Sequence, residues 1–224
     1  MALKEITHFD ISGIETGAIS MAFDGDYLYF YGAQADTIFK VSRKGELIDT
    51  YDVTGSQTDV DGLCFDGKDF WAVSKADGTL NHYNSEFVAI ETIDISGTII
   101  VDPQYMATDG KIIAVFGSTA LDLSFMNKEG QVIKTLDTST IANKVRGVAF
   151  DGHNLWVATQ DVDRVIQIDY DGNKIQTLSL SGITDLPRGH CFDGNYDRKT
   201  GNFDGKNIWI LDSRGEDVLC LSRN

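Results

Sequence analysis

Proline is scarce in this chain, with only two residues in 224. No segment has the composition of a flexible linker between folded units. The length alone allows one large domain or two small ones. We therefore expect a single domain that covers residues 1–224.

Cysteine and long apolar runs are also lacking. Three cysteines, an odd number without framework spacing, argue against a disulfide-stapled secreted domain. No apolar run approaches the ~18 residues that a membrane-spanning helix needs. The first thirteen residues alternate between polar and apolar instead of forming the apolar stretch of a signal peptide. We expect a cytoplasmic protein.

Basic residues are few relative to acidic ones. Lys and Arg number 19 against 34 Asp and Glu, a formal charge of -15. Such a charge repels phosphate backbones and anionic lipid surfaces, which argues against nucleic acid and membranes as partners. Most of it serves as a solvated surface that keeps the protein in solution, and we expect a monomer.

What the chain does have is a repeat. The tripeptide Phe-Asp-Gly begins at Phe23, Phe65, Phe150 and Phe192, with Thr108 taking the place of Phe in the third unit, and successive markers are 42 or 43 residues apart. Asp-Gly between apolar runs is a strong hairpin signal, because Gly readily adopts the positive φ that tight turns need. Each unit contains four short apolar runs, which predicts four strands.

The fourth run of each unit carries an isoleucine at the same place, Ile48, Ile90, Ile133 and Ile175. Apolar residues on both faces of a strand indicate burial on both sides. We therefore expect these strands to be covered and each unit to need a like neighbour on either side.

The two ends of the chain complement each other. Eleven residues are inserted between Phe192 and a second Phe-Asp-Gly at Phe203, which predicts a lengthened first hairpin in the last unit. The chain then stops after a third strand, and residues 3–13 match the missing fourth one. The sequence predicts an all-β, five-bladed β-propeller of four-stranded antiparallel blades, closed by its N-terminal strand. A β-helix or a sandwich fits this period less well.

The pattern FDGxxLWVA…VxxIDxDG of residues 150–172 resembles the blades of bacterial propellers of the YVTN, NHL and streptogramin-lyase type. The resemblance covers nearly all of residues 6–224 and lies in positions that form the fold. Streptogramin lyases are larger, seven-bladed enzymes, and no catalytic set of theirs matches this chain. Five blades in a chain of this size is also similar to the tachylectin type of sugar-binding propeller, whose sugar-site motifs are not evident.

Unlike residues break the repeat just before each first strand. Four positions ahead of the markers stand Ile19, Asp61, Gln104, Arg146 and Arg188. A propeller would gather them around one channel mouth, where Arg suits a carboxylate or phosphate and Asp and Gln suit hydroxyl groups. The sequence thus predicts a binding site for a small polar ligand, a glycan or a protein segment at Asp61, Gln104, Arg146 and Arg188. Ion pairs that merely join neighbouring blades are the structural alternative.

His190 replaces an apolar residue. The equivalent positions hold Met21, Leu63, Met106 and Val148. One hypothesis makes His190 a catalytic base, with the two arginines stabilising negative charge and Asp61 orienting the ring. The other makes it a hydrogen-bonded core residue.

The inserted hairpin carries a possible calcium loop. Asp193, Asn195, Asp197 and Asp204 fall at positions 1, 3, 5 and 12, a spacing that suits oxygen ligation of Ca²⁺ and is similar to the DxNxD core of integrin-type calcium loops. Arg198 stands where the sharp turn needs Gly, and these residue types are also ordinary turn formers. Calcium is the one cofactor that the sequence suggests.

Two functions stay open. The first is a ligand- or partner-binding propeller that uses the channel mouth, favoured because no nucleophile with a paired base is recognisable. The second is a lyase or hydrolase with a His/Arg/Asp site at the same mouth. The fold alone does not separate them.

Overall fold

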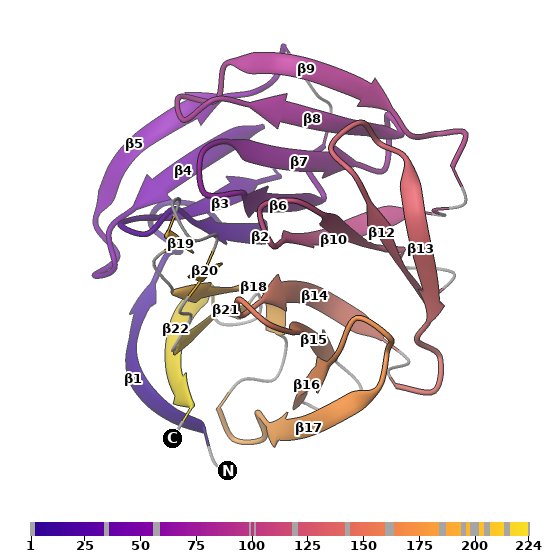
Figure 1. The fold of residues 1–224 in the computed structure, drawn as a ribbon. Helices are drawn as coiled ribbons and strands as arrows, with labels where there is room; N and C mark the ends of the chain where they lie inside the picture. Colours follow the sequence, from indigo (N-terminus) through magenta and orange to yellow (C-terminus); the bar gives the residue numbers. More distant parts are fainter. Residues whose placement is uncertain are drawn as a thin grey trace.

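Five four-stranded antiparallel sheets stand around a common axis in the computed structural model (Figure 1). The structure describes residues 3–33, 36–55, 59–98, 100, 102–117, 121–141, 144–159, 164–183, 187–193, 196–197, 202–203, 207–212 and 216–223. Within these ranges, no helix has the length and apolar character needed to cross a membrane. The predicted five-bladed β-propeller is confirmed.

Each blade follows the order of the chain from the axis outward. Blade one consists of β2 (Ala18–Phe23), β3 (Leu28–Gly32), β4 (Thr37–Val41) and β5 (Leu47–Asp52). Blade two consists of β6 (Gly62–Phe65), β7 (Phe70–Ser74), β8 (Thr79–Tyr83) and β9 (Ala89–Asp94). Blade three consists of β10 (Pro103–Thr108), β11 (Ile113–Gly117), β12 (Asp122–Met126) and β13 (Val132–Asp137). Blade four consists of β14 (Val145–Phe150), β15 (Leu155–Thr159), β16 (Arg164–Ile168) and β17 (Lys174–Ser179).

Blade five joins the two ends of the chain. Its order is β18 (Pro187–Asp193), β21 (Asn207–Asp212), β22 (Asp217–Arg223) and β1 (Leu3–Asp10). β1 runs antiparallel to β22, with Leu3 opposite Arg223 and Asp10 opposite Asp217, and the two strands lie side by side in Figure 1. Closure by the N-terminal strand is confirmed, and it covers an edge that would otherwise be open to pairing.

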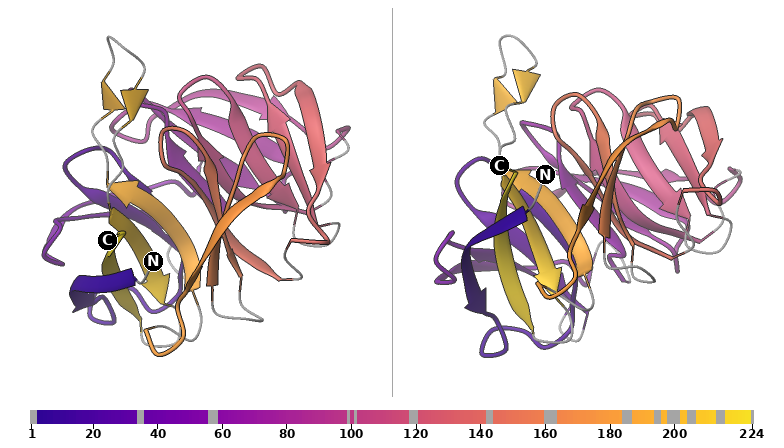
Figure 2. Two further views of the ribbon diagram at one scale, coloured as in Figure 1. Left: turned by 60° about the horizontal axis from the view of Figure 1, so that its bottom comes forward. Right: turned by 90° about the horizontal axis from the view of Figure 1, so that it is seen from below.

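The insertion lengthens the first hairpin of blade five, as predicted. Phe192 pairs with Ile208, just as Phe65 pairs with Phe70 where no insertion is present. The extra residues include the short strands β19 (Tyr196–Asp197) and β20 (Asn202–Phe203), which form a ribbon of their own. Figure 2 shows this ribbon standing away from the ring.

The hydrophobic core lies between blades. One cluster joins Phe30 of blade one to Trp209 of blade five, and another joins Trp71 of blade two to Met126 of blade three. The remaining clusters fill the other junctions in the same manner. Each blade therefore has an apolar partner on both sides, which is the arrangement that the repeat predicts.

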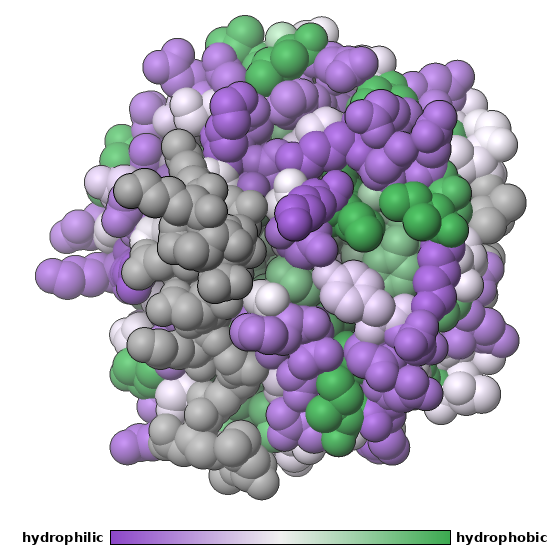
Figure 3. Space-filling model, in the orientation of Figure 1, coloured by the Kyte–Doolittle hydropathy of each residue, from purple (hydrophilic) through white to green (hydrophobic). Residues whose placement is uncertain are grey.

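The outermost strands differ from the prediction. The shared isoleucine is about half exposed in every blade, at 55% for Ile6, 47% for Ile48, 54% for Ile90, 59% for Ile133 and 50% for Ile175. The expectation of burial on both faces was wrong here, because blades diverge with distance from the axis and the outer strand has solvent on one side. On the face drawn in Figure 3, hydrophobic residues occur in separate groups, around the edge and near the centre, among hydrophilic ones.

The aspartate of each Phe-Asp-Gly marker organises its hairpin. Asp66 accepts backbone N–H groups two and three residues ahead, and its other oxygen accepts Trp71 Nε1 at 2.8 Å. Asp151 does the same with Trp156 Nε1 at 2.7 Å. The following Gly67 and Gly152 have φ of 91° and 95°, in the region that glycine favours. These turns, together with those between third and fourth strands, make up one side of the ring, here called the turn face.

Candidate functional site at the channel mouth

The side of the ring opposite the turn face is where each inner strand begins, and it holds the channel mouth. A pocket of about 90 Å³ opens there, lined by Ile19, Asp61, Gln104, Tyr105 and Arg146. These residues come from blades one to four, and three of them are predicted ligand-binding residues. The structure thus brings Asp61, Gln104 and Arg146 to one pocket, while their role as ligand contacts stays a prediction.

Irregular strand pairing marks three of these positions. In β2, β10 and β14 the register with the second strand shifts at one residue, and the residues left out of the pairing are Ile19, Gln104 and Arg146. A bulge inserts one extra residue, bends the strand and turns a side chain away from the regular alternation. The bulges therefore explain why these side chains face the mouth.

Asp61 stands directly before β6. Its backbone N–H donates to Val73 O at 2.9 Å, and its Oδ2 accepts the backbone N–H of Lys75 at 2.7 Å. Burial raises the pKa of Asp61 to about 6; the Lys75 hydrogen bond opposes this rise, and the charge of Asp59 adds to it. Within the pocket, Asp61 is thus a carboxyl group that changes charge near neutral pH.

Blade five departs from the other blades at this level. The register of β18 shifts between Arg188 and His190, so the residue outside the pairing is Gly189. Gly189 has a φ of +48°, and a Cβ there would lie 3.1 Å from Met21 N. Arg188 pairs with Leu211 through its backbone, and its side chain lies outside the described residues.

His190 is buried in the channel, with 3% of its surface exposed. Its Nε2 is 2.9 Å from the carbonyl oxygen of Trp156 in blade four, whereas Nδ1 has no hydrogen-bond partner in the described part of the chain. A Cβ at Gly147 would lie 2.4 Å from Nδ1, so the ring packs against β14. Burial lowers the pKa of His190 to about 4 against the opposing effect of the Trp156 carbonyl, and the ring is neutral at pH 7.

These contacts can be compared with the hypothesis that His190 is a catalytic base oriented by Asp61. The hydrogen-bond partner of His190 is a backbone carbonyl of the neighbouring blade and not Asp61. An imidazole that joins two blades and has 3% exposure fits the hydrogen-bonded core residue that the sequence also suggested. A catalytic role for His190 stays a hypothesis with no support from these contacts.

The suggested calcium loop falls largely outside the described residues. Asn195 and Asp204 are not described, and of Asp197 only the backbone in β19 is. Both carboxylate oxygens of Asp193 accept hydrogen bonds from Asn207, at 2.9 Å from its backbone N and 2.9 Å from its Nδ2. In the described ranges there is no group of three or more His, Cys, Asp or Glu arranged to hold a metal. Calcium stays a prediction.

Sequence reasoning missed a second hollow at the other end of the channel. A well of about 60 Å³ opens toward the turn face, lined by apolar residues of the inner strands and by the marker aspartates Asp24, Asp66 and Asp109. A spacing of five residues separates Asp24 from Tyr29 and Asp66 from Trp71, whose polar groups donate to these carboxylates, and it was a readable signal for both. Asp109 has Ala114 at that spacing and accepts Tyr170 Oη of blade four instead.

Known protein structures resemble this chain in their fold. No protein-family model and no curated protein matches the chain. A glutaminyl cyclase from Myxococcus xanthus superposes with a TM-score of 0.74 at 11% identity, covering 98% of this chain and 95% of that one. A streptogramin B lyase gives 0.54 at 14% identity over 93% and 66% of the two chains. A catalytically inactive virginiamycin B lyase from Staphylococcus aureus, with quinupristin, gives 0.57 at 11% over 94% and 82%. The chain is a five-bladed β-propeller that shares its fold with the glutaminyl cyclase and streptogramin lyase propellers.

Proposed function

We propose that this protein is a ligand-binding propeller whose channel mouth holds a small polar ligand, or the polar end of a glycan or protein segment. The proposal rests on the observation that Asp61, Gln104 and Arg146 line one and the same pocket. Asp61, Gln104 and Arg146 occupy equivalent positions in three blades, where the repeat alone would allow the same residue each time.

The chemistry of the pocket narrows the ligand. Burial raises the pKa of Asp61, so a positive or hydroxyl donor of a ligand would stabilise the ionised carboxylate. Arg146 offers a planar set of N–H donors that suits a carboxylate. A small molecule or chain terminus that carries both an amino group and a carboxylate uses both residues.

A lyase or hydrolase at the same mouth is the second candidate. One observation favours it: a pKa of about 6 lets Asp61 serve as a general acid or base near neutral pH. Enzymes named glutaminyl cyclase and streptogramin lyase share the fold, although identities of 11 to 14% carry no residue roles across. In this version Asp61, rather than the buried His190, is the acid–base group.

Four probes separate the contributions that an amino group, a carboxylate and hydroxyl groups of a ligand make to binding in the pocket. Glycylglycine carries an amino group and a carboxylate, glycinamide only the amine, acetate only the carboxylate, and galactose only hydroxyl groups. Binding is measured by calorimetry and by the shift of the melting temperature. We expect glycylglycine to bind most tightly, with about tenfold weaker binding in both Asp61→Asn and Arg146→Gln, since a charged hydrogen bond contributes about 1.5–3 kcal/mol.

Arg43→Gln is the matched control, because Arg43 is an exposed arginine on the turn face that donates to Gly25 O. Its binding should equal that of the unmodified protein. A response to none of the four probes, or equal losses in all three variants, would count against the site.

A further inference from the structure

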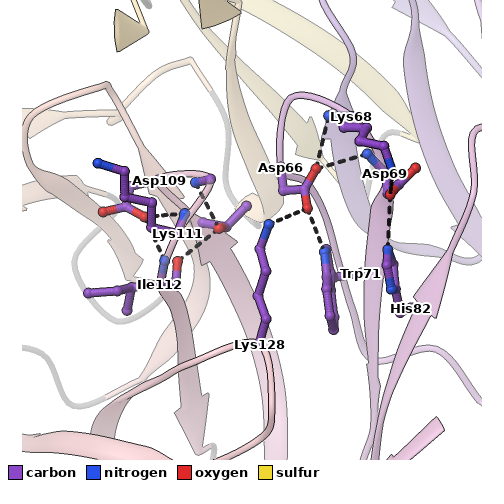
Figure 4. A network of polar contacts seen from close by, with 11 residues as sticks. Asp66, Lys68, Asp69, Trp71, His82, Asp109, Lys111, Ile112 and Lys128 are labelled. Atoms are coloured by element: carbon purple, nitrogen blue, oxygen red, sulfur yellow. Dashed lines mark hydrogen bonds and ion pairs between the residues drawn. The ribbon is translucent and has the colours of Figure 1, made fainter. Parts of the chain in front are cut away.

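A larger hollow lies away from the channel mouth, on the turn face between blades two and three. This groove has a volume of about 410 Å³. It is lined by Gly67 and by the side chains of Asp66, Lys68, Asp69, Trp71, His82 and Lys128, which Figure 4 shows. We call it the turn-face groove.

Asp66 fixes one ammonium group at the wall of this groove. Its Oδ1 accepts the backbone N–H groups of Lys68 and Asp69, and its Oδ2 accepts Trp71 Nε1 and, at 2.6 Å, Lys128 Nζ. Burial opposes ionisation of Asp66, but the hydrogen bond from Lys128 and the other donors outweigh it and hold the pKa below its usual value. Each oxygen of the Asp66 carboxylate thus accepts two hydrogen bonds. The ammonium group of Lys128 has more N–H donors than this contact uses, so donors remain for a further acceptor.

Asp69 orients two further side chains of the groove, Lys68 and His82. Its Oδ2 accepts Lys68 Nζ at 2.6 Å and lies 3.1 Å from His82 Nε2. The His82 ring is stacked on the indole of Trp71, with centroids 4.2 Å apart and planes 4° from parallel. The imidazole is thus held between Asp69 and the indole of Trp71.

The other blades lack this set. The equivalents of Asp69 are Tyr27, Ile112 and Asn154, and those of His82 are Lys40, Phe125 and Gln167. The equivalent of Lys128 in blade four, Tyr170, donates to the marker aspartate Asp109. Asp66 is the marker aspartate that every unit carries, whereas the combination of Asp69, His82 and Lys128 around it is a local departure from the repeat.

We propose that the turn-face groove binds a small oxyanion, a carboxylate or phosphate group, between the ammonium groups of Lys68 and Lys128. The two buried aspartates hold these ammonium groups in place, so little side-chain freedom is lost when the anion binds. Donor N–H groups that flank one groove are the chemistry that recognises oxyanions. The site uses no residue of the channel mouth and is independent of the function proposed there.

The test uses inorganic phosphate and malonate as probes, with sodium chloride as the ionic-strength control, and records calorimetric binding and melting temperature. We expect saturable binding of at least one probe beyond the chloride response. Binding of phosphate alone assigns a phosphate ligand, and binding of malonate alone assigns a carboxylate. No saturable response to either probe overturns the proposal.

Lys68→Ala should weaken binding about tenfold, because it removes one of the two ammonium groups that contact the anion. Lys111→Ala is the matched control: Lys111 is the exposed equivalent of Lys68 in the turn of blade three, and its backbone N–H donates to Asp109 in the same way. Figure 4 shows both lysines. Equal losses in Lys68→Ala and Lys111→Ala would overturn the proposal, because general surface charge would then explain the response. Lys128 is changed only to Arg, since its removal would leave Asp66 buried without a counter-charge.

Discussion

At the scale of single residues, carboxyl groups differ sharply in what surrounds them. Asp66 is buried with two backbone donors, an indole and an ammonium group, and its pKa lies below the usual value. Asp61 is half-buried with one backbone donor, the N–H of Lys75; burial raises its pKa to about 6, and the charges of Asp59 and Asp102 add to the rise. The first carboxylate supports the fold. The second is the carboxyl group on which the proposed ligand site relies.

Asp61 should make stability depend on pH. Its folded pKa of about 6 exceeds the usual 3.8, so between these values the folded state binds more protons than the unfolded state. The contribution of Asp61 therefore becomes less favourable as the pH rises from 4 to 7. Asp61→Asn removes this contribution and keeps an oxygen for the Lys75 N–H. We expect the melting temperature of Asp61→Asn, relative to the unmodified protein, to rise from pH 4 to pH 7. A difference that stays constant with pH would contradict the assignment.

At the scale of strands, position within a blade decides what a side chain contributes. β7 is buried along its whole length, whereas β9, two strands farther out, is mostly exposed. Four of the five residues of β7 are apolar, whereas β9 includes the polar residues Glu91, Thr92 and Asp94 and lies where neighbouring blades diverge. Exposed isoleucines on the outer strands follow from this geometry and need no partner to explain them.

A pair of substitutions on adjacent strands tests this gradient. Leu80 in β8 is fully buried, and Leu80→Ala should cost about 2–5 kcal/mol of unfolding free energy by leaving a cavity. Ile90 in β9 is 54% exposed, and Ile90→Thr should change stability by no more than about 0.5 kcal/mol while keeping a β-branched side chain. Denaturant unfolding measures both. A cost for Ile90→Thr near that of Leu80→Ala would show that the outer strand is covered in solution.

At the scale of the whole molecule, the repeat allowed the fold to be predicted from the sequence. A period of 42 or 43 residues located the hairpins, the inserted ribbon and the missing fourth strand, because each depends on local pattern. The same period placed Asp61, Gln104 and Arg146 at one level of the ring. The bulges at Gln104 and Arg146 depend on strand register, which a pattern of residue types does not show. The turn-face groove needs Lys128 to reach Asp66 across a blade junction, 62 positions away. Tyr170 reaches Asp109 in the same way, and neither contact can be read from the residue pattern within one unit.

Ring closure supplies the prediction at this scale. Deleting residues 1–13 removes β1 and leaves β22 as an open edge, so the truncated protein should melt at a lower temperature or aggregate. Light scattering and thermal melts measure this effect. A synthetic peptide of residues 1–13 should restore the melting temperature, whereas the same peptide with proline at Thr7 and Phe9 should not. A truncated protein that stays in solution with an unchanged melting temperature would contradict closure by this strand.

The pairing of β1 with β22 also has a consequence for how the protein is made. Leu3 leaves the ribosome before blade one, but its partner Arg223 follows only after blades one to four have been translated. Blades one to four can form as they emerge, because each takes its strands from one continuous stretch of chain. Until β22 arrives, β1 has no strand to pair with, and the first and last blades each lack a neighbour. The nascent chain is therefore an incomplete ring whose two end blades each expose an apolar face. Pairing of β1 with β22 closes the ring in a single late step between residues far apart in the sequence.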